Sequence, residues 1–400
     1  MLDYLIASRK RKYITKVGSS IYFNLYDSKI FMKNFKIIFY FFVSLAIVSC
    51  SLGQVNDVDV ENLSSNSLIT DSTYSCYYPY FINNNFLISY PVTKQKGCCI
   101  SKISNEGITD SKYLLDIGKG HNEFQSIVLG KGENGGLLVV ERPSSLNKLL
   151  SVTSIPANKN ADEMSNVESW KKYNLSNIKS SFGITTRNVV AITDSTLLIA
   201  VQPYGEDKTK SIFSILDYKN QTITPLDYWP SDGTTANDFV KTSMYVNNSF
   251  VFSNGKDRYL YLCNEGYFAF IFTIEGNHVN VIKELYSEYP QYVNAEDGLN
   301  FHFKDRLPKR LIGDVNNSNI YFLHRNKKTD GTPAKDFFEA QVGDDIDVFD
   351  WDGTLQKKFH LDKNGNQIIV SEDNEHLYLF DYLSNEDGHV ISSYNLKGAK

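Results

Sequence analysis

The sequence contains none of the short motifs that most often reveal a chemistry. Its five cysteines include no C-x-x-C pair, which excludes a zinc ribbon and a thioredoxin-type redox site. Its seven histidines form no H-x-x-x-H or H-E-x-x-H pattern, and there is no G-x-S-x-G nucleophile elbow. Gly118 and Gly120 lack the third glycine of a dinucleotide-binding loop, because Glu123 stands there. We therefore predict no catalytic residue, no metal and no cofactor.

The chain also lacks the composition of a low-complexity protein and, outside its first 50 residues, an excess of basic residues. With 10 Pro and 24 Gly among 400 residues, and 42% hydrophobic and 14% aromatic content, the chain is neither collagen-like nor disordered. Residues 1–50 hold eight Lys or Arg and two Asp or Glu, whereas residues 51–400 hold 33 and 44. The net charge of −5 thus combines +6 with −11. Because a body this acidic is a poor partner for a phosphate backbone, we predict no nucleic-acid partner.

An apolar run of 13 residues, 37–49, is too short to cross a bilayer, which takes about 20 apolar residues. A short basic segment, residues 32–36 with two lysines, precedes it and Cys50 follows it, which is the order of a secretory signal peptide. Ile47-Val48-Ser49-Cys50 resembles a bacterial lipobox, which implies cleavage after Ser49 and lipid attachment at Cys50. Ordinary secretion, with cleavage after Ser49, is the alternative.

The signal divides the chain into four predicted parts. Because a signal that starts at Met32 has ordinary proportions, residues 1–31 are interpreted as a mis-assigned upstream extension. The alternative is a cytoplasmic extension with the apolar run as an anchor. Residues 32–50 are the signal peptide, and the polar residues 51–75 are predicted to be a flexible tether. Residues 76–400 are predicted to be the folded body.

Four cysteines remain after Cys50, and they permit three complete pairings. Two interpretations are open for them: free thiols, or a disulfide from Cys76 to Cys98 or Cys99, with Cys263 elsewhere in the chain. Cys98 and Cys99 are adjacent, so they would point to opposite faces of a strand.

A polar turn followed by a short aliphatic or aromatic strand recurs six times, which is the mark of a repeat protein. The steps between copies are 50, 61, 53, 70 and 57 residues. The turn markers are Asn84, Asn134, Ser195, Asn248, Ser318 and Glu375. The long fourth step predicts an insertion at residues 289–309.

A second tight turn follows each strand, so each unit predicts a four-stranded antiparallel blade. These turns lie at residues 104–107, 158–160, 218–221, 275–277, 350–353 and, less clearly, 395–398. Helical periodicity is weak, and residues 161–172 are the best short helix candidate. Radial packing would bury both faces of every blade, so we predict an all-β, six-bladed β-propeller. A two-layer sandwich is the alternative.

Two segments carry a family resemblance. LDIGKGHNEF at residues 115–124 is similar to the G-x-G-P-G-E-F type loop of six-bladed propeller lipoproteins from Bacteroidetes, with His121 and Asn122 in place of Pro-Gly. IDVFDWDGTL at residues 346–355, with FHLD at 359–362, resembles the vfDwdG hairpin of their TolB-like relatives. With the signal, the resemblance spans residues 32–400. It implies the fold and an envelope address, and it supplies no catalytic residues.

Acidic and basic groups each gather once. Asp344, Asp345, Asp347, Asp350 and Asp352 are interpreted as solvated carboxylates, because the EF-hand spacing is not met. The basic stretches near residues 302–310 and 324–328 oppose the acidic background and could guide an anionic glycan or peptide. The candidate ligand-facing residues are His302, Lys304, Arg306, His324 and Arg325.

These observations predict a cell-envelope lipoprotein that binds or scaffolds without catalysis. It would be exported and held by its N-terminal lipid at the periplasmic face or the outer-membrane surface, with a glycan, peptide or envelope protein as partner. Its ligand would lie at the channel mouth, where loops from every blade meet. The alternatives are a glycan- or ester-acting envelope enzyme with a site assembled at the channel, and a partner subunit of an envelope complex.

Overall fold

The computed structural model describes the chain from residue 58 onward. The described residues are 58–70, 76–83, 86–91, 95–104, 106–120, 122–132, 136–141, 149–156, 161–175, 178, 182–184, 188–203, 210–246, 249–383 and 390–397. The predicted signal peptide, with Ser49 and Cys50, lies outside these residues. In the described part of the chain, no helix combines the length and apolarity needed to span a membrane.

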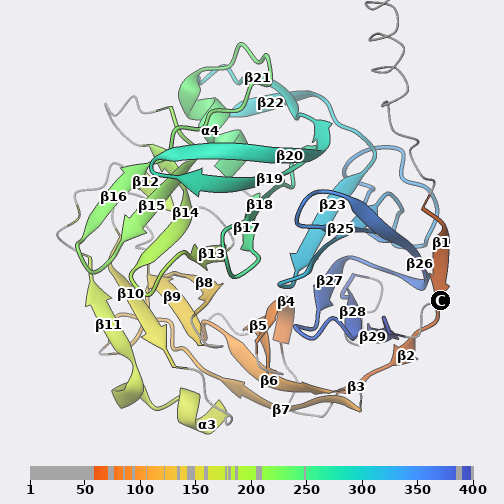
Figure 1. The fold of residues 1–400 in the computed structure, drawn as a ribbon, viewed down its shortest axis with the longest axis horizontal. Helices are drawn as coiled ribbons and strands as arrows, with labels where there is room; N and C mark the ends of the chain where they lie inside the picture. Colours follow the sequence, from red (N-terminus) through yellow and green to blue (C-terminus); the bar gives the residue numbers. More distant parts are fainter. Residues whose placement is uncertain are drawn as a thin grey trace, which may run out of the picture. The chain divides into compact units, whose positions relative to one another are not determined.

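Short antiparallel sheets follow one another around a central axis, each a meander of consecutive strands (Figure 1). The first contains β4 (Cys76–Asn83), β5 (Phe86–Pro91), β6 (Cys99–Ser104) and β7 (Gly107–Tyr113). The second contains β8 (Ile127–Lys131), β9 (Leu137–Glu141), β10 (Ser151–Ile155) and β11 (Lys171–Asn174), with α3 (Ala161–Met164) and the 3₁₀ helix η2 (Val167–Ser169) before β11. The third contains β12 (Phe182–Ile184), β13 (Asn188–Ala191), β14 (Thr196–Pro203), β15 (Phe213–Asp217) and β16 (Thr222–Pro225).

The second half of the chain continues the ring. The fourth sheet contains β17 (Ser249–Ser253), β18 (Tyr259–Cys263), β19 (Tyr267–Glu275) and β20 (His278–Glu288), and α4 (Asp238–Val246) precedes it. The hairpin β21 (Gln291–Asn294) and β22 (Phe301–Asp305) follows, within residues 289–309, where an insertion was predicted. The fifth sheet contains β23 (Arg310–Val315), β24 (Asn319–Arg325), β25 (Gly343–Asp350) and β26 (Leu355–Gly365). The sixth contains β27 (Gln367–Val370), β28 (His376–Asp381) and β29 (Val390–Asn395).

Strands buried on both faces explain why these sheets pack in a ring. In β18, Tyr259, Tyr261 and Cys263 pack toward the third sheet, whereas Leu260 and Leu262 pack toward the fifth. In the described chain, six clusters of buried side chains each join two neighbouring sheets, including the sixth and the first. The predicted all-β propeller is therefore confirmed.

One close approach depends on a glycine. β8 and β13 are the innermost strands of the second and third sheets, and they pair in parallel, with Gly130 opposite Val189. A Cβ at Gly130 would lie 2.2 Å from the carbonyl oxygen of Val189. Only glycine lets these two backbones approach so closely, and this contact merges the two meanders into one nine-stranded sheet.

The predicted tether is wrong for residues 60–70, and residues 51–57 and 71–75 lie outside the described residues. Within residues 51–75, β1 (Val60–Leu63) pairs with β26, β2 (Asn66–Ser67) pairs with β29, and β3 (Ile69–Thr70) pairs with β7. This N-terminal strap adds outer strands to the fifth, sixth and first sheets, and Leu63 and Leu68 enter the core. The segment is polar because an outermost strand buries few side chains, so its composition resembles that of a linker.

Three smaller predictions need correction. The fourth repeat marker, Asn248, precedes the first strand of its sheet, whereas the other markers precede the second strand, and this lengthens the next step. The turn predicted at 395–398 closes no hairpin, because β2 supplies the outer strand there. Helix α4 was missed, although Asn237 caps it by accepting a hydrogen bond from the Val240 N–H at 2.9 Å. The predicted hairpins at 104–107, 218–221, 275–277 and 350–353 are confirmed.

The cysteines divide between the two interpretations. Cys99 is disulfide-bonded. Cys98 and Cys263 are buried free thiols, and burial raises the pKa of both, to about 12 and about 11. Such thiols are unreactive at neutral pH, so these two cysteines contribute packing and no chemistry.

Candidate functional site

A cavity of about 560 Å³ lies where the innermost strands converge on the central axis. It is lined by residues of β4, β8, β13, β17 and β23, and by Glu372 after β27. The innermost strands supply this wall because each meander begins near the axis and proceeds outward. The cavity therefore combines residues from all six sheets.

Charged groups enter the cavity from three sheets. The Lys131 Nζ lies 3.8 Å from a carboxylate oxygen of Glu372 and 5.8 Å from the centroid of the Phe81 ring. Asp314 lies beside them and is only 3% exposed. Burial raises the pKa of Asp314 to about 6, although the Lys131 charge and the Val370 N–H oppose this shift. That N–H donates to the Asp314 Oδ2 at 2.7 Å, so the carboxylate ties β23 to β27.

A fourth charge comes from the loop after β17. The Asn254 Oδ1 accepts hydrogen bonds from the N–H groups of Lys256 and Arg258, at 2.9 and 3.1 Å, and Gly255 has a φ of +74°. These bonds fix the turn that places Lys256 at the cavity. No carboxylate lies within ion-pair distance of the Lys256 ammonium in the described part of the chain. Asn317 reaches the same loop, with its Oδ1 3.2 Å from the position of a Gly255 Cβ.

This wall offers a ligand both charged and uncharged polar groups. Among the described residues that line the cavity there are two carboxylates and no His or Cys. One of the carboxylates, Asp314, is held by a backbone N–H, and the other, Glu372, faces Lys131. Ammonium, amide and backbone groups of this kind can hold a polar or anionic ligand.

The five predicted ligand-facing residues are not brought together, and none of them lines the central cavity. His302 and Lys304 are exposed on β22. The Arg306 guanidinium lies 3.2 Å from the Phe303 ring centroid and 4.3 Å from that of Phe337, and it pairs with Glu265 at 3.1 Å. Arg325 is buried and donates to the carbonyl oxygen of Asn366 at 3.4 Å. Arg306 and Arg325 thus serve packing between elements.

His324 lies in a separate cleft of about 390 Å³. Its Nε2 is 2.9 Å from the Asp347 Oδ2, which also accepts the Tyr286 hydroxyl at 2.6 Å, and its Nδ1 bonds the Tyr267 hydroxyl. Burial favours the neutral acid, but these contacts with His324 and Tyr286 hold the pKa of Asp347 below its ordinary value. Both nitrogens of His324 are therefore occupied.

The residues that do line the channel were not singled out from the sequence, although the repeat contained a signal for them. Lys131 and Asp314 each stand two residues before a recurrent polar turn, at residues 133 and 316, and Glu372 stands one residue before another, at 373. Alignment of the copies on these turns would place all three within one or two residues of the turn. The sequence could not show that the residues just before these turns face the axis.

The ring of sheets and its axial cavity define a β-propeller protein. No protein-family model matches the chain, and neither does any curated protein. Among solved structures it is similar to a luciferin-regenerating enzyme (11% identity, TM-score 0.40, 82% of this chain and 94% of that one). It is also similar to an oligogalacturonate lyase in complex with manganese (8%, 0.43, 85% and 98%) and to the WD40 repeats of RRP9 (8%, 0.43, 85% and 100%). At this similarity, the three say nothing about what this chain binds.

Proposed function

We propose that the protein is an exported, lipid-anchored binding module of the bacterial cell envelope whose ligand occupies the central channel. The observation that carries the binding role is the cavity wall, which joins Lys131, Lys256 and Glu372 from separate sheets. A glycan or peptide that bears a carboxylate fits this wall, because the Lys256 ammonium has no carboxylate beside it. The enclosed volume suits a ligand of a few sugar or amino-acid units.

The envelope address rests on the sequence. Export and lipid attachment are supported by the order of the short basic segment 32–36, the mostly apolar run 37–49 and Cys50. The resemblance to Bacteroidetes TolB-like propeller lipoproteins supports the same address. Cells that express the chain in the presence of labelled palmitate should label it, and Cys50→Ala should abolish the label. Equal labelling of the variant would exclude the anchor and leave ordinary secretion.

Binding is tested with a library of uronate-containing oligosaccharides and acidic peptides, read by thermal shift and then by calorimetry. We expect at least one member to bind the wild type, and Lys256→Gln to weaken it at least tenfold. Lys304→Gln is the matched control, because Lys304 is an exposed lysine on β22 outside the cavity. Equal weakening by both variants, or no effect of Lys256→Gln, would contradict the channel as the site.

An envelope enzyme that acts on glycans or esters is the second candidate, and the His324–Asp347 pair favours it. A His–carboxylate pair is the usual beginning of a general base, but here Tyr267 bonds the second ring nitrogen. Esterase and glycosidase assays on the wild type and on His324→Gln distinguish the two. Turnover that disappears in the variant would replace the binding role with catalysis.

A further inference from the structure

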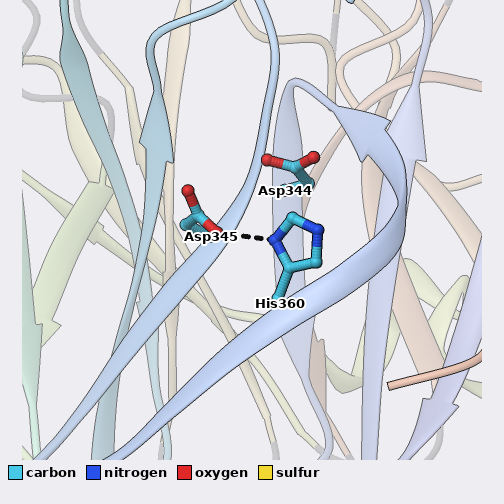
Figure 2. Close-up of side chains that lie close together, drawn as sticks. All are labelled: Asp344, Asp345 and His360. Carbon is cyan, nitrogen blue, oxygen red and sulfur yellow. Dashed lines mark hydrogen bonds and ion pairs between the residues drawn. The ribbon is translucent and has the colours of Figure 1, made fainter. Parts of the chain in front are cut away.

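Three side chains that can bind a metal converge on the fifth sheet. Asp344 and Asp345 of β25 and His360 of β26 each offer a ligand atom, and these atoms lie within 4.8 Å of one another (Figure 2). None of the three residues lines the central channel. This cluster is therefore separate from the proposed binding site.

A break in the strand register creates the cluster. Along a regular strand, consecutive residues such as Asp344 and Asp345 point to opposite faces. Here Gly343 pairs with Gly365 and Asp345 pairs with His360, so β26 has extra residues at this point and the ladder is irregular. A Cβ at Gly343 would lie 1.9 Å from the His324 carbonyl oxygen, so the bend requires glycine. The irregularity lets both aspartates approach His360.

One ligand atom in the cluster has no partner. The Asp344 side chain is 9% exposed, its Oδ2 pairs with the Lys327 Nζ, and its Oδ1 is buried without a hydrogen bond. A buried carboxylate oxygen that accepts nothing costs free energy, because it has lost its water. The Oδ1 of Asp344 is therefore available to a cation at little further desolvation cost.

The other two ligands are already adjacent and accessible. The His360 Nδ1 lies 2.8 Å from the Asp345 Oδ1, and their side chains are 45% and 50% exposed. The two atoms share a hydrogen bond at this spacing, and two ligands of a tetrahedral Zn²⁺ are roughly 3.3 Å apart, so a small opening of the pair admits the ion. The two carboxylates exceed the single Lys327 charge, so a divalent ion would not be repelled. The half-exposed side leaves room for water to complete the coordination.

We propose that Asp344, Asp345 and His360 bind one divalent first-row transition-metal ion, of which Zn²⁺ is the representative. An imidazole ligand selects Zn²⁺ over Ca²⁺ and Mg²⁺, which prefer oxygen alone. The ion joins the two strands where their ladder is interrupted, and so stabilises the outer part of the fifth sheet. Sequence spacing indicated solvated carboxylates here, because it could not show the register break.

The test uses the chelator-treated, full-length protein and Zn²⁺ alone, by titration calorimetry. We expect one equivalent to bind and the melting temperature to rise with Zn²⁺. His360→Gln and, independently, Asp345→Asn should each weaken binding more than tenfold while leaving the metal-free melting temperature within a few degrees. Both side chains are half-exposed, so these variants should fold, whereas the Asp344 side chain is buried.

His278→Gln is the matched control, because His278 forms an exposed pair with Asp227 at 3.3 Å and belongs to no three-ligand group in the described chain. It should bind Zn²⁺ like the wild type. No binding near one equivalent, wild-type affinity in His360→Gln, or equal loss in His278→Gln would each overturn the site. Binding of Ca²⁺ as tightly as Zn²⁺ would overturn the assigned class of metal.

Discussion

Two aspartates are enclosed in different surroundings, Asp232 in the region beside α4, here called the corner, and Asp314 in the wall of the central channel. Their pKa values are shifted in opposite directions. In the corner, the Asp232 carboxylate accepts from the Lys241 Nζ and from the Tyr245 and Tyr292 hydroxyls, each at 2.8 Å. Burial favours the neutral acid, but these bonds outweigh it and hold the pKa of Asp232 below its ordinary value. At the channel, burial raises the pKa of Asp314 to about 6.

The difference shows that enclosure alone does not decide the charge of a buried acid. Asp232 has a charged donor in contact and two hydroxyl donors, whereas Asp314 has backbone N–H donors and the more distant charge of Lys131. Charge-assisted hydrogen bonds replace the lost hydration far better than a distant cation does. The charged Asp232 therefore stabilises the packing of the corner. The channel wall, in contrast, contains a carboxyl group that can change its protonation near neutral pH.

The largest effect is expected when the corner loses its acid. Asp232→Ala leaves the Lys241 ammonium, whose side chain is 9% exposed, without its partner, and removes the acceptor of two tyrosine hydroxyls. We expect a loss of about 3–5 kcal/mol in the free energy of unfolding, measured with urea at pH 7. Adding Lys241→Met should recover part of the loss. A change below about 1 kcal/mol would show that the corner does not lock the fold.

The channel acid should behave in the opposite way. Between about pH 4, the unfolded pKa, and pH 6, folded Asp314 binds more protons than the unfolded chain, so the free energy of unfolding falls as pH rises. Above pH 6 its charge costs up to about 3 kcal/mol. Asp314→Asn should abolish this fall and stabilise the protein at pH 7.5, as urea unfolding from pH 4 to 8 will show. Parallel profiles for the two proteins would refute the assignment.

A smaller change removes one donor from the corner. Tyr292→Phe takes one hydroxyl from the Asp232 Oδ2 and should cost about 1–2 kcal/mol in the free energy of unfolding. Tyr289→Phe is the control, since its hydroxyl bonds the exposed Glu284 at 3.1 Å. Equal losses in the two variants would mean that the contact with Asp232 is worth no more than a surface bond.

The smallest effect concerns the distant cation. Lys131→Met removes the charge that lowers the pKa of Asp314, so the midpoint of the fall in stability between pH 4 and 6 should move to higher pH. Lys131 is partly exposed, so solvent screens the interaction and the effect on stability at pH 7 should stay below about 1 kcal/mol. A midpoint that moves to lower pH would reverse the assigned role of Lys131.

Patterns confined to one strand or one turn were predictable. The apolar residues of β18 show no polar alternation, and such a strand must be covered on both faces, which a ring of sheets provides. The turns at 104–107, 218–221, 275–277 and 350–353 carry Asn, Asp and Gly where hairpins need them, and all four were placed correctly. The β21–β22 hairpin lies within residues 289–309, where an insertion was predicted, although the misplaced marker Asn248 accounts for the length of that step.

Pairings between distant segments were not predictable. The strap of β1, β2 and β3 contains too few apolar residues to signal a strand, and its partners lie up to about 330 residues away. The candidate site depends on the same kind of information, because only closure of the ring brings Lys131, Lys256 and Asp314 to one cavity. His324 was predicted to face a ligand, and its polar contacts in the structure are with Tyr267, Tyr286 and Asp347.

By itself, the sequence determined the repeat, the turns, the β-propeller class and the expectation of export, because each depends on residues that are close along the chain. Tertiary structure alone decided which charges meet. Lys131 and Asp314, or Asp344 and His360, come from strands whose register and neighbours are set by packing across sheets. The register shift between Gly343 and Asp345 redirects a side chain without leaving a periodic mark, so the sequence could not show where it points.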